Sequence, residues 1–468
     1  MEQLIEIGKI VPKRSLDIKY SKLGIGFEKL DRNVFDPEKA YDKLALVGVK
    51  WVRIQSGWQR TERQKGVYDF EWIDKVVDNL IARGMKPWIC LCYGNELYNE
   101  EAKEVFGAVG IAPIFNDEQK LGWANYVKAT VEHFKGRVDH WEIWNEPDGK
   151  WCWKHGVSAR EYGLFAVDTA KAIREVSSDA VIIGGAICMI GNLDYVNTAL
   201  SVGMADVIDA FSFHEYTADE TALYKHVPAL RALLDSYNPK IKLIQGESGS
   251  QSRSDGCGAL RGGAWTPARQ AKQCLRHAVA DLHTGVEFSS YFSCMDMIEA
   301  LNGTVGDKNS YLDYGYFGIL GADFDENGFS SGEYSPKPSY YAYQNLCSVF
   351  AEGAEVCELP LLRLNLPSKR MLGNDYGGTL TMHSFKKPNG SYALAFWNPS
   401  PLLTTDFEST VSFRTARLPE KISLVDLMDG RIYRLPDECI ERNGGSTAIK
   451  NVPVKDYPML LTFGDFAC

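Results

Sequence analysis

The sequence has no apolar run long enough to span a membrane and no cluster of basic residues. No apolar stretch reaches the roughly 18 residues that a membrane helix needs. The chain starts Met-Glu-Gln-Leu-Ile-Glu-Ile, without a basic segment followed by an apolar one, so no secretory leader is expected. Acidic residues outnumber basic ones by 61 to 51, and the formal net charge is -10. We therefore expect no membrane span, and we exclude nucleic acid as the main partner.

Cysteine is present without the spacing that disulfide frameworks or metal sites require. The 11 Cys are an odd number, and no two are spaced Cys-x-x-Cys. Buried free thiols are expected, because several Cys lie in apolar segments, namely Cys90, Cys92, Cys188 and Cys347. This usage favours a reducing cytoplasm, or a periplasmic or secreted location if a signal peptide has been removed. We expect neither a cofactor nor a metal.

The length and composition are those of a large globular protein rich in aromatic residues. A chain of 468 residues is long enough for one large barrel with an appendage, or for two to three domains. Hydrophobic residues make up 45% and charged residues 24%. Aromatic residues reach 12%, with 11 Trp and 23 Tyr. Aromatic rings suit the faces of sugars, although protein cores also use them.

Short β-prone runs alternate with longer segments of helical period over residues 23–350, which is typical of parallel α/β folds. Helices are expected after these strands, and Pro lies acceptably in the first turn of two of them. The predicted strands are 23–27, 51–55, 87–92, 138–144, 180–184, 207–214, 241–245 and 286–292. The clearest predicted helices are 71–83, 117–134, 158–176, 267–283 and 338–349.

Eight such units predict an α/β fold of the (β/α)8 TIM-barrel type over residues 21–351, with the active site at the carboxyl ends of the strands. After residue 351 the pattern changes to short alternating strands between Asn-Gly and Pro-rich turns. Residues 352–468 are therefore expected to form a C-terminal antiparallel β-sandwich domain, which the β-prone segment 1–20 joins. The strands expected there include 379–385, 392–397, 410–413 and 459–463.

Two predicted strands end on a carboxyl group. The fourth runs into Asn145-Glu146-Pro147, and the seventh closes on Gly246-Glu247. Strands four and seven of an eight-stranded barrel face each other across the mouth, so the two carboxyl groups can flank one bond. Cleavage of a glycosidic bond needs such a pair, because protonating the leaving oxygen and supporting the oxocarbenium-like transition state are separate tasks.

The residues around this pair resemble those of clan A of the glycoside hydrolases, the retaining barrel enzymes. The likeness rests on Trp-Asn-Glu-Pro at 144–147, Glu247, and the His214 and Tyr216 that follow strand six. Arg53 on strand two and Lys-Pro-Ser-Tyr-Tyr-Ala at 337–342 are also typical of the clan. Residues 66–87 are similar to the region between strands two and three of family 39 β-xylosidases and their relatives. The resemblance covers residues 23–350.

The resemblance implies a role for each of these residues. Glu146 would be the general acid and then the general base, and Glu247 the nucleophile that forms a glycosyl-enzyme. Arg53 would hold the negative charge of Glu247, and Tyr216 would orient it through its hydroxyl. Asn145 would hydrogen-bond the 2-hydroxyl of the sugar.

Some of these residues also have structural interpretations. Glu142 shares the strand face of Trp144 and Glu146, so Arg53 and Glu142 can instead form an ion pair inside the barrel. By one interpretation His214 supports the active site, and by the other it is a structural histidine. An acidic loop after the eighth strand either holds a cation or is simply solvated, and it contains Asp296, Glu299, Asp307 and Asp313.

Aromatic residues at or soon after the strand ends are candidates for stacking on sugar rings. For each, packing in the core or in a loop is the alternative. Tyr291 stands where clan A enzymes often have Trp, and Tyr93 stands where they commonly have His. The candidates are Trp58, Tyr93, Trp151, Trp153, Trp265 and Tyr291.

The predicted function is that of a retaining, exo-acting, β-xylosidase-like glycoside hydrolase on β- or equatorially linked oligosaccharides or glycosides. Three long loops at the mouth, 93–116, 250–266 and 293–318, favour a closed pocket and hence the exo mode. The alternatives are an endo-acting glucanase or xylanase, a non-catalytic carbohydrate-binding barrel, and transglycosylation by the same carboxyls. The sandwich binds sugar, joins a second protomer in a homo-oligomer, or packs on the barrel; no residue decides between these or specifies the sugar.

Overall fold

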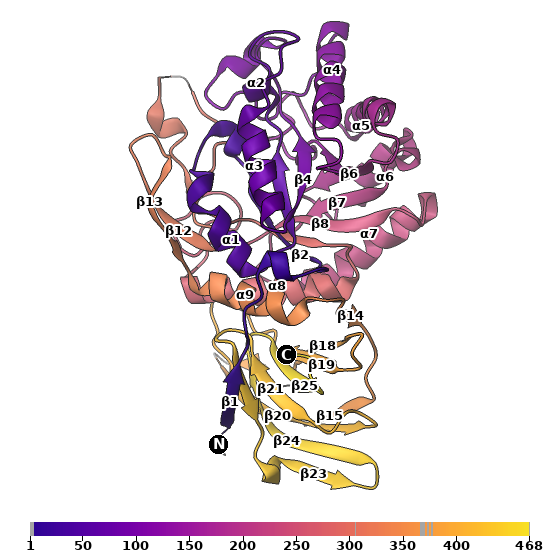
Figure 1. Ribbon diagram of the computed structural model, residues 1–468, viewed down its shortest axis with the longest axis vertical. Coiled ribbons are helices and arrows are strands. Elements are labelled where there is room, and N and C mark those ends of the chain that lie inside the picture. The colour runs from indigo at the N-terminus through magenta and orange to yellow at the C-terminus, as the bar shows by residue number, and fades with distance from the viewer. Residues whose placement is uncertain (1–3, 305, 366–369, 372–373, 376–377, 468) are drawn as a thin grey trace.

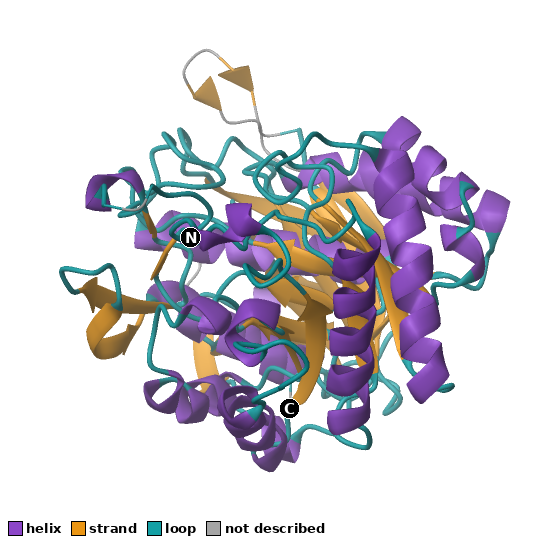
Figure 2. Ribbon diagram, turned by 90° about the horizontal axis from the view of Figure 1, so that it is seen from above, coloured by secondary structure: helices purple, strands orange, loops and turns teal. Residues whose placement is uncertain are grey.

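Eight parallel strands close into a barrel in the computed structural model, which describes residues 4–304, 306–365, 370–371, 374–375 and 378–467. Each strand overlaps one of the eight predicted segments, so the predicted barrel is confirmed (Figures 1 and 2). In barrel order the strands are β2 (Leu23–Gly26), β3 (Trp51–Gln55), β4 (Lys86–Leu91), β5 (His140–Ile143), β6 (Val181–Ile187), β7 (Ala210–His214), β8 (Lys242–Ser248) and β9 (Ser289–Tyr291).

Helices follow the strands and cover the outside of the barrel. Side-chain caps explain several of their starts: Asn116 accepts from the backbone of Gln119, and Ser158 from that of Glu161. The α-helices are α1 (Tyr41–Val47), α2 (Trp58–Thr61), α3 (Glu71–Ala82), α4 (Asp117–His133), α5 (Ala159–Val176), α6 (Leu193–Ser201), α7 (Leu223–Tyr237), α8 (Pro267–Thr284) and α9 (Pro338–Phe350). None of the helices in the described ranges is long and apolar enough to cross a membrane.

The C-terminal region contains two antiparallel sheets, as predicted, and α8 and α9 lie between them and the barrel (Figure 1). The first sheet has the order β1 (Ile5–Lys9), β22 (Arg431–Arg434), β21 (Ile422–Asp426), β25 (Met459–Phe463), β19 (Tyr392–Trp397), β18 (Thr381–Lys386) and β14 (Glu355–Val356). The second has the order β15 (Leu361–Asn365), β20 (Glu408–Ala416), β24 (Ser446–Lys455) and β23 (Ile440–Asn443). The N-terminal β1 therefore lies at an edge of the larger sheet, while the domain division after residue 351 stays a prediction.

Three two-stranded sheets complete the fold. Two of them belong to the segment between β9 and α9. They are β10 (Met297–Ile298) with β11 (Tyr314–Gly315), and β12 (Leu320–Phe324) with β13 (Ser330–Pro336). The third pairs β16 (Arg370–Met371) with β17 (Asn374–Asp375).

Apolar side chains fill the barrel toward the amino ends of its strands, and charged side chains occupy the next layer, toward the carboxyl ends. Trp88, Ile183, Ala210, Ile244 and Phe288 form a separate buried cluster. Since side chains alternate between the two faces of a strand, Arg53 shares the inner face of β3 with Trp51, and Glu142 shares that of β5 with His140. The barrel interior thus has one layer of buried apolar side chains and, nearer the carboxyl ends of the strands, a second layer of buried charged side chains.

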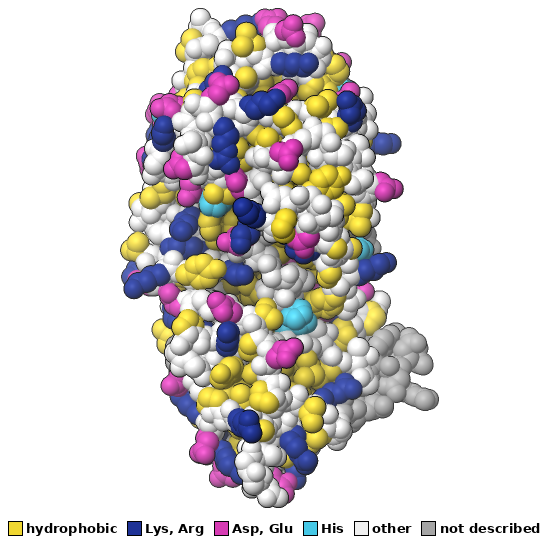
Figure 3. Space-filling view, turned by 90° about the vertical axis from the view of Figure 1, so that its right-hand side faces the viewer, with side chains coloured by type: hydrophobic (Ala, Val, Ile, Leu, Met, Phe, Trp, Pro, Cys, Tyr) yellow, Lys and Arg dark blue, Asp and Glu magenta, His cyan; other side chains and the backbone are white. Residues whose placement is uncertain are grey.

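On the face shown in Figure 3, acidic and basic side chains are interspersed over the barrel and the sheets. No cluster of one sign covers this face.

A buried ion pair joins the barrel to the large sheet. Arg276 of α8 lies with its Nε 2.8 Å from Oε2 of Glu220, and both side chains are almost fully buried. Trp397 of β19 donates its indole N–H to the other Glu220 oxygen at 2.8 Å. Arg276 also donates to the carbonyl of Ser400 at 3.0 Å.

Arg276→Met is expected to lower the free energy of unfolding by about 3–5 kcal/mol, because it leaves the buried Glu220 carboxylate without its cation. Urea denaturation followed by tryptophan fluorescence measures the loss. The control is Lys171→Met, which removes an exposed pair with Asp168 and is expected to cost less than about 1 kcal/mol. Equal small losses in the two variants would contradict the prediction.

Candidate active site

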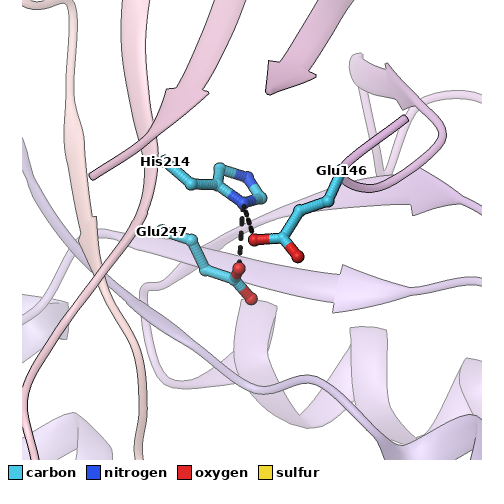
Figure 4. A group of neighbouring side chains, drawn as sticks. All are labelled: Glu146, His214 and Glu247. Atoms are coloured by element: carbon cyan, nitrogen blue, oxygen red, sulfur yellow. Dashed lines mark hydrogen bonds and ion pairs between the residues drawn. The ribbon is translucent and has the colours of Figure 1, made fainter. Parts of the chain in front are cut away.

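Glu146, His214 and Glu247 meet at the carboxyl ends of three barrel strands. Glu146 follows β5, His214 ends β7 and Glu247 lies in β8, and their side chains point toward one another (Figure 4). Nδ1 of His214 lies 3.1 Å from Oε1 of Glu146 and 2.9 Å from Oε2 of Glu247. One polar atom from each of the three lies within 4.8 Å of the other two. The structure therefore brings the two predicted carboxyls together.

Backbone irregularities aim both carboxyls into the barrel. Glu146 has a positive φ of 43°, which few residues other than glycine adopt, and its N–H donates to the carbonyl of Ala186 at 2.8 Å. In β8 the register shifts between Gln245 and Ser248. Simple alternation would put Glu247 on the outer face with Gln245, whose amide lies 3.4 Å from His277 of α8; the bulge turns Glu247 inward.

The bulge has two local supports. Oε1 of Gln245 accepts the backbone N–H of Glu247 at 3.1 Å, so the irregular N–H keeps a partner. Gly246 leaves space for its neighbours, because a Cβ there would overlap Oγ of Ser212 and lie 3.1 Å from Nε2 of His214.

Arg53 is fully buried and contacts three carboxylates at once. Its Nε and Nη2 donate to Oε2 of Glu142 at 2.8 and 2.5 Å. Its Nη1 lies 3.3 Å from Oε1 of Glu247 and 3.4 Å from Oε1 of Glu28. Nη2 also donates to Oδ1 of Asn145 at 2.8 Å. The two interpretations of Arg53 are thus compatible, since it pairs with Glu142 and contacts Glu247 together.

The charges of the site set the protonation of Glu247 and His214. Burial alone would raise the pKa of Glu247, but His214 and Arg53 outweigh it and lower that pKa to about 2. Burial disfavours the charged form of His214, yet Glu247 and the hydrogen bonds to both carboxylates raise its pKa to about 9. At neutral pH an ionised Glu247 therefore faces a protonated His214.

The same three side chains are the one group of His, Cys, Asp or Glu in the described residues with donor atoms close enough to hold a metal ion. The Nδ1 atom that would bind a metal already lies between the two carboxylates. With the pKa of His214 raised to about 9, that atom carries a proton at neutral pH, whereas a metal ligand must be unprotonated. The arrangement fits a proton donor between two carboxylates better than a metal centre; that no metal or cofactor is used stays a prediction.

Four predicted supporting residues lie close to the pair. Trp151 donates its indole N–H to Oε2 of Glu146. Nδ2 of Asn145 lies 3.4 Å from Sγ of Cys152, and the hydroxyl of Tyr93 lies 3.8 Å from the same sulfur. The ring of Tyr216 packs against Phe292 and Phe317. Burial, followed by the charge of Glu247, raises the pKa of Tyr216, but among the described contacts its hydroxyl makes no hydrogen bond to Glu247.

Four predicted aromatic residues make no described contact with the carboxyl pair. Trp58 is fully buried against Tyr98, Trp123 and Tyr126, so its ring faces are not free for a sugar. Trp265 is 3% exposed and donates to the carbonyl of Leu260.

Tyr291 packs outward against Tyr343 of α9. The next residue, Phe292, faces the site instead, because strand alternation reverses the direction of neighbouring side chains. Trp153, also a candidate, is fully buried beside Trp144 and Phe165.

The carboxyl groups of the predicted acidic loop do not lie together. Asp296 is bound by Lys337 at 2.6 Å, and Glu299 lies 3.6 Å from Lys29. Asp307 and Asp313 are exposed. Sequence reasoning missed Glu28, Lys29 and Phe292 near the pair; a search of every strand end for charged residues would have found Glu28, two residues after β2.

A cavity of about 590 Å³ lies beyond the carboxyl ends of β3 and β4; Arg32, Trp58 and Tyr93 line it, whereas Glu146 and Glu247 do not. Two of the residues that line it contact Gln55 of β3: Arg32 donates to it at 2.9 Å, and Gln55 donates to the Tyr93 hydroxyl at 3.2 Å. Phe106 and Val109 of the 93–116 loop form part of its wall.

His214→Asn is expected to lower the free energy of unfolding most near pH 6 and least near pH 10. The pKa of His214 rises from 6.5 to about 9 on folding, so its stabilisation is complete below pH 6.5 and is lost as the pH rises through 9. The difference corresponds to about 3 kcal/mol at roughly 1.4 kcal/mol per pKa unit.

Denaturation curves between pH 6 and 10 measure this dependence. His277→Asn is the control: burial lowers the pKa of His277 to about 3, so above about pH 7.5, where the unfolded ring is neutral too, the cost of replacing it is expected to be constant. Below that pH the unfolded ring takes up a proton and the cost is expected to fall slightly, opposite in sign to the trend for His214→Asn. A constant cost for His214→Asn as well would refute the assignment of its charge.

Comparisons with known proteins relate the chain to one glycosidase family. Residues 39–227 match the family model described as glycosyl hydrolases family 39. A β-xylosidase of Geobacillus stearothermophilus is 30% identical over 131 residues, which are 26% of this chain and 25% of that relative. A β-xylosidase of Caldicellulosiruptor saccharolyticus is 27% identical over 198 residues, 39% of each chain. The alignments thus span a quarter and about two fifths of the relatives' own lengths.

The fold comparison extends over nearly the whole chain. A solved family 39 glycoside hydrolase from the gut symbiont Bacteroides cellulosilyticus WH2 superposes with a TM-score of 0.65 and 18% identity, covering 94% of this chain and 80% of that one. At this identity the match speaks for the fold. Together with the family-model match, it confirms the resemblance of this chain to the family 39 glycosyl hydrolases of clan A.

Proposed function

We propose that the protein is a glycoside hydrolase of the β-xylosidase type that cleaves by double displacement and retains the anomeric configuration. The observation that carries the proposal is the approach of Glu146 and Glu247, each with one oxygen within 4.8 Å of the other and of His214. Retaining enzymes have carboxyl groups about 5–5.5 Å apart, whereas inverting enzymes leave about 6.5–9.5 Å for a water molecule. The names of the matched β-xylosidases support the same class of substrate.

In the first step a carboxylate oxygen of Glu247 attacks the anomeric carbon, and the bond from that carbon to the leaving oxygen breaks. Glu146 transfers its proton to the leaving oxygen. The lowered pKa of Glu247, about 2, keeps this nucleophile ionised at any practical pH. Trp151, through its hydrogen bond to Glu146, orients the proton donor.

In the second step Glu146, now ionised, takes a proton from water while the water oxygen attacks the anomeric carbon. The ester bond to Glu247 breaks, and its carboxylate returns to the contacts of Arg53 and His214. Asn145 donates a hydrogen bond to the 2-hydroxyl of the sugar. Arg53 binds the side-chain oxygen of Asn145, so the amide N–H₂ beside Cys152 is the donor.

Contacts between the three long loops support the exo mode. Phe106 of the 93–116 loop meets Tyr311 of the 293–318 loop edge to face, with ring centroids 5.7 Å apart. The 250–266 loop also contacts the 293–318 loop. The backbone N–H of Ser252 donates to the carbonyl of Tyr316 at 2.9 Å, and that of Cys257 donates to the carbonyl of Tyr314 at 2.8 Å. Loops that contact one another form a continuous wall, which suits a pocket for a terminal sugar.

Glu247→Gln is expected to lower kcat/KM on aryl glycosides on the order of 10,000-fold or more, because the nucleophile is lost. Glu146→Gln is expected to cost about 100- to 10,000-fold on a phenyl glycoside. Its cost should be far smaller on a 2,4-dinitrophenyl glycoside, whose leaving group needs no proton. Steady-state kinetics on both substrates measure these losses.

Glu215→Gln is the matched control, since Glu215 adjoins His214 but faces His226 of α7 at 3.9 Å; its activity should stay near wild type. Full activity of Glu247→Gln would contradict the proposed nucleophile. A wild-type protein that binds oligosaccharides without cleaving them would instead be a carbohydrate-binding barrel.

Hydrolysis of β-1,4-xylo-oligosaccharides is expected to release xylose from the non-reducing end, with the first product in the β configuration. Proton NMR of the early reaction reports the anomer, and chromatography of end-labelled oligomers reports the position of cleavage. Mid-chain products would replace the exo mode by an endo one, and a first product of the α configuration would overturn retention. A panel of aryl glycosides identifies the sugar.

A further inference from the structure

Glu28 is a third glutamate at the centre of the barrel. It follows β2, and its neighbours on both sides are hydrogen-bonded to β3: the N–H of Phe27 to the carbonyl of Arg53 at 2.8 Å, and the N–H of Lys29 to the side chain of Gln55 at 3.1 Å. The side chain has no exposed surface. Its carboxyl occupies the space above Gly26, where a Cβ would overlap Oε2 of Glu28. This part of the chain is thus built to hold a carboxyl inside the barrel.

The carboxyl of Glu28 competes with Glu247 for one nitrogen. Nη1 of Arg53 lies 3.4 Å from Oε1 of Glu28 and 3.3 Å from Oε1 of Glu247. The other nitrogens of Arg53 serve Glu142 and Asn145. Oε2 of Glu28 has no hydrogen-bond partner among the described residues. Glu28 is therefore the least well bound of the three carboxyls around Arg53.

We propose that Glu28 is a positioning residue that shares Arg53 with Glu247 and thereby sets how firmly Arg53 holds the nucleophile. It acts through Arg53 and does not touch the substrate. The inference rests on the proposed function, because it assigns the nucleophile to Glu247.

The mechanism is a competition that depends on the charge of Glu28. Burial raises the pKa of Glu28 to about 8; Arg53 opposes this, and the negative charge of Glu247 adds to it. Below pH 8 Glu28 is a neutral acid, and the charge of Arg53 serves Glu142 and Glu247. Above pH 8 Glu28 ionises, draws on the same Nη1 and adds a negative charge beside the nucleophile. Arg53 then holds Glu247 less firmly in position, and its attack on the anomeric carbon becomes slower.

Other charged groups face Glu28 from the surrounding elements. Arg53 lies on β3 and Glu247 on β8, with Glu142 of β5 on the far side of Arg53. Tyr216 after β7 and Cys294 after β9 also feel its charge, but burial raises the pKa of each well above the ordinary value, so both stay neutral.

Two further groups complete the surroundings. Lys29, next in sequence, is paired with Glu299 at 3.6 Å, and burial lowers its pKa. His214 titrates near pH 9 and contacts Glu247. A variant at Glu28 leaves His214 in place, so the ratio of variant to wild type isolates the titration of Glu28.

Glu28→Gln keeps the shape of the side chain and makes it permanently neutral. The experiment measures kcat/KM of the full chain between pH 5.5 and 9.5 with 4-nitrophenyl β-D-xylopyranoside. The ratio of variant to wild type should be near one at pH 6 and should rise by pH 9, one unit above the titration of Glu28, to at most about tenfold, the value for an inactive ionised form. A ratio that does not change with pH overturns the proposal, as does a large loss at pH 6.

The matched control is Asp281→Asn. Burial raises the pKa of Asp281 well above its ordinary value too, but this carboxyl accepts from Ser289 at 2.6 Å and does not contact Arg53. Asp281→Asn should leave the pH profile of kcat/KM unchanged. A rise with pH like that of Glu28→Gln would mean a general effect of removing a buried acid, and would overturn the role through Arg53.

Thermal unfolding gives a readout independent of turnover. An acid whose pKa rises from 4.5 to about 8 on folding makes the fold less stable as the pH rises between those values. The Tm of Glu28→Gln minus that of the wild type should therefore increase from pH 5 to pH 8 and then level off; a constant difference overturns the proposal. A wild type that cleaves no glycoside overturns the proposed function instead, and the Tm difference still reports the protonation of Glu28.

Discussion

The guanidinium of Arg53 is the one interaction on which the rest of the site depends. A cation buried in a barrel is stable only if carboxylates surround it closely, since taking charges out of water costs more than a loose pair returns. Arg53 meets this condition with Glu142 and Glu247, while Glu28, a neutral acid below pH 8, adds a weaker contact. The same contacts that allow Arg53 to be buried therefore hold Glu247, the proposed nucleophile, at the barrel mouth.

The constraint explains the irregular backbone of β8. A regular strand would send Glu247 outward with Gln245, toward α8 and away from Arg53. The bulge at Gly246 turns it to Arg53 and His214, and the side chain of Gln245 satisfies the backbone N–H that the bulge displaces. The irregular register of β8 and the stabilisation of the charge of Glu247 thus depend on each other.

Much of this could be predicted from the sequence, because strand ends in a parallel barrel share one rim. That rule predicts Glu146 and Glu247 as neighbours, and the resemblance to clan A adds Arg53. It failed for Tyr291 and Trp58, because the direction of a side chain changes with each residue and with each bulge, which composition and spacing do not reveal. Glu28 was missed for a different reason: it looks like a lone charged residue after a strand, and its meaning comes only from Arg53, which lies 25 residues further on.

The division between chemistry and specificity follows from the same layering. The proposed catalytic residues Glu146 and Glu247 lie on or next to strands, where the hydrogen-bond ladder fixes their positions. The walls of the proposed pocket come from loops that contact one another, such as Phe106 against Tyr311 and Ser252 against Tyr316. Loop side chains can change without disturbing the ladder, so the carboxyl pair can stay constant while the sugar differs. For this reason we expect residues on the strands to determine how a glycosidic bond is cleaved. We expect residues of the three loops at the barrel mouth to determine which sugar is bound.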